Sequence, residues 1–573
     1  MSDGRLTVFL ITVGALAWWQ AGGPFATTLA LVLLGAGGYL GLVFWHRALR
    51  RRAAWTRAHH RLAREGLHRI DRDWEALPAP TLGEPPPDHA YAADLDLLGR
   101  ASIEQVLGPV ATPAARRMLR AWLLAAATPA DVRARQAAAA ELAGLTDQRL
   151  ELAARGRLAG HLETRQADRF MEWAEREPWL RRSGAVLWTA RLLPAATLGL
   201  AGLGVAGVVD GRWWLAPVAA ALMLTGRHAA RLKSTFAAAT PADTLRDYVA
   251  IFACARTLEA RTSALLAVRD RLDGAARALE RLRRLIHLAD MRLSILHFVA
   301  QLVLLWDFHI VWLLERWKAA HGAHARDWLD ALGETEALAA LGTLSFDHPD
   351  WCWPEMATGA PRVEARALAH PMLRADRAVA NDVQLGPPGR FLLVTGSNMS
   401  GKSTLLRAIG ANVVLAQCGA PACAAALRLA PLRVHTSMRI RDSLAAGVSL
   451  FMAEVQRLGR IVEAAEAPDA RAALYLLDEI LQGTNLEEHR VGARWILTRL
   501  TTANAIGAVA THDLEVAAET PLRVAARHVH FQEEVVETET GPTLTFDYAL
   551  RPGPATTRNA LVIMRLAGLE AEG

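Results

Sequence analysis

The sequence feature that most restricts the fold is a nine-residue run starting at Gly396. It consists of Gly396, Ser397, Asn398, Met399, Ser400, Gly401, Lys402, Ser403 and Thr404, and it fits the pattern GxxxxGK[ST]. An apolar, strand-type segment (391–394) precedes it, and a helix-forming segment (405–411) follows. Between a strand and a helix, such glycines let backbone N–H groups close around phosphates, and the helix N-terminus adds partial positive charge. The run therefore predicts an α/β domain with a mostly parallel sheet.

Two further segments supply the residue types that phosphate chemistry needs. The apolar strand 474–477 leads into Asp478 and Glu479, and the strand 505–510 leads into His512. We expect Lys402 to reach the β and γ phosphates of ATP, and Ser403 and Asp478 to ligate Mg²⁺. Glu479 is the predicted general base, and His512 is expected to contact the γ-phosphate or orient the attacking water. The alternative for the two acids is an ordinary strand end with solvated carboxylates, which the neighbouring loop makes less plausible.

Length and composition describe a mixed, multi-domain chain. The 573 residues exceed one compact domain, and 52% hydrophobic with 21% charged residues suits a protein that is partly membrane-embedded. The net charge of +6 suits nucleic acid or an anionic membrane and does not choose between them. The four cysteines form no CxxC pair, which argues against a disulfide framework or a zinc site.

The N-terminus predicts a transmembrane helical hairpin over residues 1–46. Two uncharged apolar runs, 6–19 and 25–45, are separated by a short turn, and the second is long enough for a hydrocarbon core of roughly 30 Å. A basic juxtamembrane linker, 47–90, follows and should stay cytoplasmic. The alternative, a cleaved signal peptide, lacks a small-x-small cleavage site.

Three helical regions are predicted between the N-terminus and the α/β domain. Residues 91–183 form a helical core domain, 184–228 a second probable transmembrane hairpin, and 229–346 long lever helices. A buried soluble helix pair remains the alternative for 184–228, because its second arm is short. The apolar stretch 293–314 carries four polar residues, so we assign it to the soluble part; these are His297, Gln301, Asp307 and His309. Residues 347–573 complete the fold class as a C-terminal α/β P-loop NTPase domain.

Together these motifs resemble the MutS family of DNA mismatch repair ATPases. Residues 395–410 are similar to its phosphate loop, 476–485 to its Walker B segment and 510–515 to its histidine switch, while 442–454 are similar to its signature segment. The resemblance implies ATP and Mg²⁺ as cofactors and a homodimer in which Ser449 reaches the partner's ATP. Fainter similarity covers 94–99 and 116–124, at the start of the family's helical core.

The departures from this family matter for function. Its mismatch-reading N-terminal domain has no room here, because a membrane hairpin occupies that position. The aromatic residue that stacks on adenine in the family falls at Ala378. Mismatch recognition by the family's usual route is therefore not expected.

The resulting hypothesis is a dimeric, membrane-anchored ATPase that binds double-stranded DNA or another partner. We expect a multi-pass protein of a bacterial-type inner membrane with its ATPase domain in the cytoplasm. One alternative is an ABC-type ATPase or transporter subunit, although no LSGGQ-like signature precedes Asp478. The other is a membrane-bound MutS-like ATPase that acts on a protein or lipid.

Overall fold

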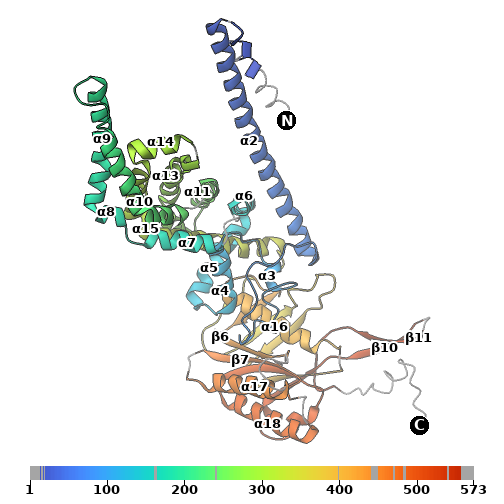
Figure 1. The fold of residues 1–573 in the computed structure, drawn as a ribbon. Helices are drawn as coiled ribbons and strands as arrows, with labels where there is room; N and C mark the ends of the chain where they lie inside the picture. The colour runs from blue at the N-terminus through green and yellow to red at the C-terminus, as the bar shows by residue number, and fades with distance from the viewer. Residues whose placement is uncertain are drawn as a thin grey trace. The chain divides into compact units, whose positions relative to one another are not determined.

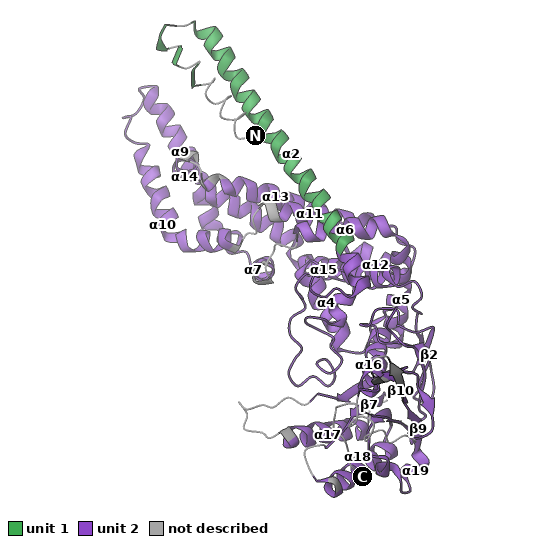
Figure 2. Cartoon of the chain, turned by 90° about the vertical axis from the view of Figure 1, so that its right-hand side faces the viewer, with its two compact units in different colours: residues 1–64 green, residues 65–573 purple. Residues whose placement is uncertain are grey.

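The structure is a computed structural model of the whole chain, and it is mostly helical with two mixed sheets and a β-hairpin. It describes residues 13–14, 17–18, 20–22, 24–159, 164–238, 242–293, 295–397, 399–439, 450–468, 471–481, 485–538 and 541–555. The chain divides into two compact units, residues 1–64 and 65–573 (Figure 2). The first unit consists chiefly of the N-terminal part of helix α2 (Phe25–Asp71).

Helix α2 changes character along its length. Its first half is apolar and exposed, with Phe25 and Leu34 more than 60% accessible, and its second half carries the basic residues. The basic segment was expected as a linker, but residues 47–71 continue the same helix. An uninterrupted helix fits the sequence, since no proline or glycine pair interrupts this stretch.

The helical part of the second unit is built around the 42-residue helix α15 (Trp306–Asp347), which packs on α4, α5, α7 and α13. The other helices are α3 (Ile103–Val106), α4 (Pro113–Leu124), α5 (Pro129–Gly144), α6 (Thr146–Ala159), α7 (Thr164–Glu175), α8 (Trp179–Arg182), α9 (Gly184–Val205), α10 (Leu215–Ala238), α11 (Ala242–Thr257), α12 (Ser263–Arg271), α13 (Ala275–Ala289), η1 (Asp290–Leu293) and α14 (Ile295–Leu304). Threonine caps followed by proline start α4 and α5, which is a favourable N-terminal sequence. This confirms the predicted all-helical core.

The apolar helices differ in part from the expectation. Among the described residues, α2 and α9 are long and apolar enough to cross a membrane, whereas α10, the second arm of the 184–228 hairpin, does not pass that test. The stretch 293–314, expected as one helix, is broken at Leu305, whose φ is 49°. Helices α14 and α15 meet there at 84°, and they count as a third candidate span only if the bent pair is taken as one.

The C-terminal part is an α/β domain (Figure 1). It is built around a six-stranded sheet with the order β12-β9-β4-β8-β7-β6. Its strands are β4 (Phe391–Thr395), β6 (Leu432–Ser437), β7 (Ala472–Asp478), β8 (Ala505–Ala510), β9 (Ala526–His530) and β12 (Arg551–Pro552); all pairs are parallel except β9 with β12. Helix α16 (Lys402–Cys418) packs on one face, and α17 (Leu450–Glu466) and α18 (Leu486–Thr502) pack on the other. The short helices η3 (Leu514–Ala517) and α19 (Leu522–Ala525) follow β8. The predicted parallel α/β sheet is confirmed.

Two smaller β-structures accompany this sheet. A four-stranded sheet has the order β1-β5-β2-β3, and its strands are β1 (Glu355–Met356), β2 (Val363–Leu368), β3 (Asn381–Leu385) and β5 (Ala426–Leu429). A hairpin joins β10 (Glu533–Thr538) and β11 (Gly541–Phe546). Residues 355–356 pair with β5 as strand β1.

Gly507 on β8 provides a test of the sheet packing. A Cβ atom at this position would lie 2.3 Å from both the ring and the carbonyl oxygen of buried Tyr475 on β7. We expect Gly507→Ala to lower the free energy of unfolding by about 3 kcal/mol, because a backbone carbonyl cannot move aside. Gly459 on α17 has nothing within 4 Å of its Cβ position, so Gly459→Ala should stabilise by about 1 kcal/mol. Denaturant unfolding of both variants measures the difference, and equal effects would contradict the packing.

Candidate functional site

Three adjacent strands end together at one edge of the six-stranded sheet. Strand β8 lies between β4 and β7, and the ladder sets Ala510 opposite both Val394 and Asp478. Two further backbone bonds extend this alignment past the strand ends: Thr511 N donates to Val394 O and Glu479 N donates to Ala510 O, each at 3.0 Å. Since parallel strands present their carboxyl ends at the same edge, the three predicted segments meet there, as the sequence indicated.

The loop between β4 and α16 is closed by glycines where no side chain fits. Gly396 and Gly401 have φ of 147° and 106°, and a Cβ on Gly396 would lie 2.7 Å from the Ser400 hydroxyl oxygen. A Cβ on Gly401 would lie 3.2 Å from the ring of Tyr548. Helix α16 begins at Lys402, directly after the loop, so its N-terminal N–H groups face the loop. Asn398 lies outside the described residues.

Lys402 is buried, and its ammonium group is held by the loop itself. The Nζ atom donates to the carbonyl oxygens of Gly396 and Ser397 at 2.8 Å each. It also lies 3.6 Å from Glu479 Oε1. The charge is therefore already placed at the mouth of the loop, where an anion would meet it.

The two acids occupy different environments. Burial raises the pKa of Asp478, and a hydrogen bond with Ser403 opposes this shift. Its Oδ1 atom is buried and has no hydrogen-bond partner among the residues that the structure describes. Glu479, in contrast, lies between Lys402 and His512, with its Oε1 atom 3.6 Å from Lys402 Nζ and 3.7 Å from His512 Nδ1. His512 itself is mostly exposed.

Ser403 and Asp478 fit the ligand set of a Mg²⁺ ion. Magnesium prefers oxygen ligands and usually takes one or two from the protein, while water and phosphate fill the rest. The unpartnered Oδ1 atom of Asp478 and the neighbouring Ser403 hydroxyl supply such a pair. Within the described ranges, no cluster of three or more His, Cys, Asp or Glu side chains could hold a metal without further ligands.

A cavity of about 1060 Å³ opens beside these groups. Its polar end is lined by Lys402, Ser403, Asp478 and Glu479. Its other lining residues come from several elements and are largely apolar: Leu368, Ala369, His370, Leu373, Arg377, Val379, Asn381, Ser397, Met399, Gly401, Thr404, Leu405, Ala408, Met438, Phe451, Glu454, Phe531 and Tyr548. A volume of this size suits a ligand larger than an inorganic ion.

Tyr548, Glu454 and His370 are among the lining residues that were not predicted as site residues. The Tyr548 ring stacks near Phe546, with 5.9 Å between ring centroids, and its carbonyl oxygen accepts from Asn381 Nδ2 at 3.0 Å. Glu454 on α17 accepts from Leu481 N at 2.6 Å, just after Glu479. Burial lowers the pKa of His370 to about 4, so this ring is neutral at pH 7. Of the three, Glu454 falls within residues 442–454, the stretch that is similar to the family's signature segment.

The outcome for the other predicted residues is mixed. Ser397, Met399 and Thr404 line the cavity, and Ser400 lies buried within the loop. Ser449 lies outside the described residues, so its role in a partner's site stays a prediction. Ala378 is not among the lining residues, although its neighbours Arg377 and Val379 are.

By fold and site, the C-terminal part is an α/β domain with a glycine-rich loop at the carboxyl edge of a parallel sheet. Residues 392–572 match the family model of MutS domain V. A stretch of 246 residues, 42% of this chain, is 34% identical to the DNA mismatch repair protein MutS 2 of Halobacterium salinarum, and it covers 27% of that protein. This domain is therefore similar to the corresponding part of MutS-family proteins, which confirms the resemblance. The matched stretch spans about a quarter of that relative's length.

The substitution Asp478→Asn tests the interpretation that this carboxylate is a cation ligand. Because burial raises the pKa of Asp478, folding favours the neutral carboxyl, and this preference lowers the stability of the fold as the pH rises above the unfolded-state pKa. We expect the isosteric amide to raise the melting temperature at pH 7 in the absence of ligands and to abolish stabilisation by Mg²⁺ with nucleotide. Thermal unfolding with and without these ligands measures both effects. A variant that melts below the wild-type protein would contradict this assignment.

Proposed function

We propose that the chain is a MutS-like ATPase that binds ATP with Mg²⁺ at this site and hydrolyses it to ADP and phosphate. The observation that carries the proposal is the convergence of Lys402, Ser403, Asp478 and Glu479 at the polar end of one large cavity. No structural role requires a buried lysine, an unpartnered aspartate oxygen and a glycine-closed loop at the same strand ends.

Each residue has a role that follows from its position. Phosphate oxygens replace the carbonyls of Gly396 and Ser397 as acceptors for Lys402, whose ammonium then neutralises the β and γ phosphates. Ser403 and Asp478 hold the Mg²⁺ ion, which neutralises charge that develops on the phosphates. Glu479 accepts the proton of the attacking water, and His512 beside it orients that water.

The apolar end of the cavity suits the adenine base. Tyr548 lies over Gly401 and faces the cavity, and Phe531, Leu373 and Val379 line the same region. We propose that Tyr548 supplies the stacking surface that is missing at Ala378, because an aromatic ring can stack on a base from either side. The proposed homodimer, with Ser449 acting in the partner's site, follows from the family alone.

Variants of Glu479 and Lys402 separate ATP binding from hydrolysis. We expect Glu479→Gln to lower the hydrolysis rate by roughly 10²–10⁴-fold while ATP binding persists, because only proton transfer is lost. Lys402→Ala should weaken binding itself, because the charge that meets the phosphates is gone. Phosphate release and equilibrium binding of a fluorescent ATP analogue measure the two effects in the full chain. Glu487→Gln, an exposed change on α18, serves as the control. Unchanged turnover in Glu479→Gln would remove Glu479 from the base role.

Duplex DNA in the same assay tests the second part of the hypothesis. A DNA mismatch repair relative makes DNA the first partner to examine. Binding that weakens with salt, with hydrolysis stimulated by homoduplex or mismatched DNA, supports a DNA-linked ATPase.

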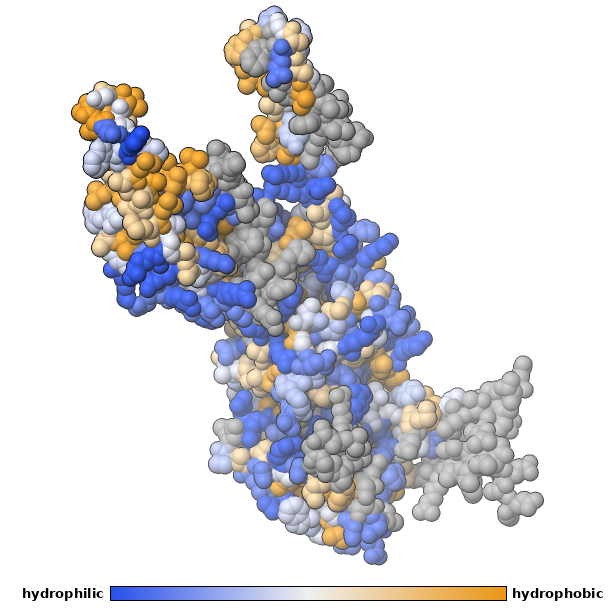
Figure 3. Space-filling view, in the orientation of Figure 1, coloured by the Kyte–Doolittle hydropathy of each residue, from blue (hydrophilic) through white to orange (hydrophobic). Residues whose placement is uncertain are grey.

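We further propose that the protein is a multi-pass membrane protein whose nucleotide site faces the cytoplasm. Helices α2 and α9 have the length and hydropathy of membrane spans. Apolar side chains also gather on the surface around α9 and α10, and Val205 and Met223 there are 92% and 71% exposed (Figure 3). A patch of this kind marks a membrane or protein contact. Arginines at the base of the pair, Arg181, Arg182 and Arg227, suit anionic headgroups.

Helix α14 belongs to this apolar group, because its polar residues are satisfied internally. His297 Nε2 lies 2.9 Å from Asp307 Oδ1, and Gln301 Nε2 donates to Thr225 Oγ1 on α10 at 3.1 Å. On the opposite side, Phe298 and Val299 are 68% and 58% exposed. The polar residues that assigned this stretch to the soluble part therefore face protein, and the exposed face is apolar.

Lipid contact of α14 is measured by a fluorophore at Phe298. In a full chain with its four native cysteines replaced, Phe298→Cys carries an NBD label and is reconstituted into vesicles with doxyl-labelled lipids. We expect a blue-shifted emission that doxyl lipids quench, because the label lies in the acyl region. Phe346→Cys, at another exposed aromatic position on α15, should remain unquenched. A blue shift without quenching would indicate a protein contact, and neither effect would indicate water.

A further inference from the structure

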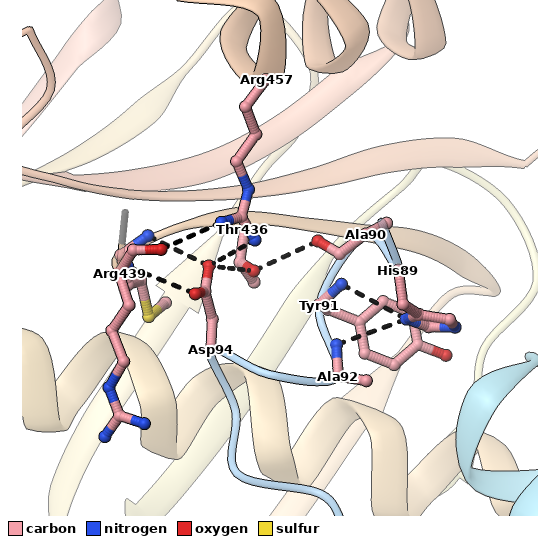
Figure 4. A network of polar contacts seen from close by, with 9 residues as sticks. His89, Ala90, Tyr91, Ala92, Asp94, Thr436, Arg439 and Arg457 are labelled. Atoms are coloured by element: carbon pink, nitrogen blue, oxygen red, sulfur yellow. Dashed lines mark hydrogen bonds and ion pairs between the residues drawn. The ribbon is translucent and has the colours of Figure 1, made fainter. Parts of the chain in front are cut away.

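The carboxylate of Asp94 lies at the centre of a buried network that joins the start of the helical part to the α/β domain (Figure 4). Its Oδ2 atom accepts from the Thr436 hydroxyl at 2.7 Å, from Met438 N at 3.1 Å and from Arg457 Nη2 at 2.8 Å. Its Oδ1 atom accepts from Arg439 N at 3.2 Å. One fully buried carboxylate thus holds both the end of β6 and helix α17.

The residue that follows Asp94 packs against α16, the helix that begins at the phosphate loop. A Cβ atom on Gly410 of α16 would lie 2.5 Å from Leu95 Cδ2 and 2.9 Å from Leu476 Cδ1 on β7. The glycine therefore makes room for Leu95 against the backbone of α16. Asp94 and Leu95 together contact three elements of the α/β domain: β6, α17 and α16.

Helix α17 links Asp94 to the segment that follows Glu479, the proposed general base. Arg457, which pairs with Asp94, lies one turn from Glu454, whose carboxylate accepts from Leu481 N at 2.6 Å. Leu481 is two residues beyond Glu479. Phe451 and Glu454 on α17, and Met438 after β6, also line the nucleotide cavity. Fixing α17 therefore fixes the segment that follows the acid pair.

We propose that Asp94 is a positioning residue for the proposed hydrolysis. By holding α17 and the end of β6 against the start of the helical part, it sets where Glu479 stands relative to the phosphates. A small displacement of a catalytic group lowers the rate far more than it lowers binding, because binding is spread over the whole loop. This inference rests on the proposed ATPase function.

Asp94→Asn keeps the shape of the side chain and removes the charge that pairs with Arg457. We expect kcat for ATP hydrolysis to fall by about tenfold or more, with KM within about threefold of the wild-type value. Arg457→Gln removes the same ion pair by changing its more exposed partner. It should likewise lower kcat while leaving KM nearly unchanged, so it provides the test if Asp94→Asn folds poorly. The double variant should be no slower than Asp94→Asn, because both changes break one interaction.

Asp88→Asn is the matched control, because Asp88 joins the same two segments through Arg460 at 4.0 Å but is 89% exposed. Its kcat should equal that of the wild-type protein, as surface pairs contribute little. Wild-type kcat in a folded Asp94→Asn or Arg457→Gln variant overturns the inference and leaves the proposed function intact. A fall in kcat matched by an equal loss of folded protein, or additive effects in the double variant, also overturns it. A wild-type protein that does not hydrolyse ATP removes the proposed function and this inference with it.

Discussion

The backbone register of β4, β8 and β7 is the constraint on which the rest of the site depends. Because Ala510 pairs with both Val394 and Asp478, the ladder places the loop, the acid pair and His512 at one edge before any side chain contributes. The alternating side chains of these strands are buried on both faces, so a slip by one residue would exchange the two sides of the core. Gly507 fits this picture, since Tyr475 fills the space where its side chain would lie.

At this edge of the sheet, several polar groups lack a full set of hydrogen-bond partners among the described residues. The Asp478 carboxylate is buried beside Ser403. Among the described residues, the partners of Lys402 are loop carbonyls and a carboxylate at 3.6 Å. Burying such groups lowers the stability of the empty domain, and a ligand that supplies phosphate oxygens and a cation would restore it. The same arrangement explains why the loop needs glycine at 396 and 401, where the backbone itself must face the ligand.

The sequence predicted the parts of the site that are local and missed those that the tertiary fold brings in. Lys402, Ser403, Asp478 and Glu479 belong to short segments whose residue types and spacing already indicate their chemistry. Tyr548 reaches the cavity only because the chain after β11 passes beside β3, where Asn381 binds its carbonyl oxygen. The break at Leu305 was missed for a related reason. The polar residues around it looked costly in an apolar setting, and only the folded chain shows His297 paired with Asp307.

Helix α15 makes the helical part stiff along its length, as a mechanical connection to the phosphate-loop region requires. At 42 residues it is about 60 Å long, and it is pinned at two points by buried carboxylates that accept backbone N–H groups. Glu315 accepts from Leu180 N and Arg181 N at the start of α8, beside the apolar helices, while Glu336 accepts from Ala111 N and Thr112 N at the start of α4. Burial raises the pKa of Glu336, which shows how strongly its surroundings exclude water. Sliding α15 along either neighbour would strand a buried carboxylate and several N–H groups, which is far costlier than moving the packed helices together. Since α4 and α5 in turn pack on α16, an unbroken series of packed helices connects the apolar end of α15 with the phosphate-loop helix.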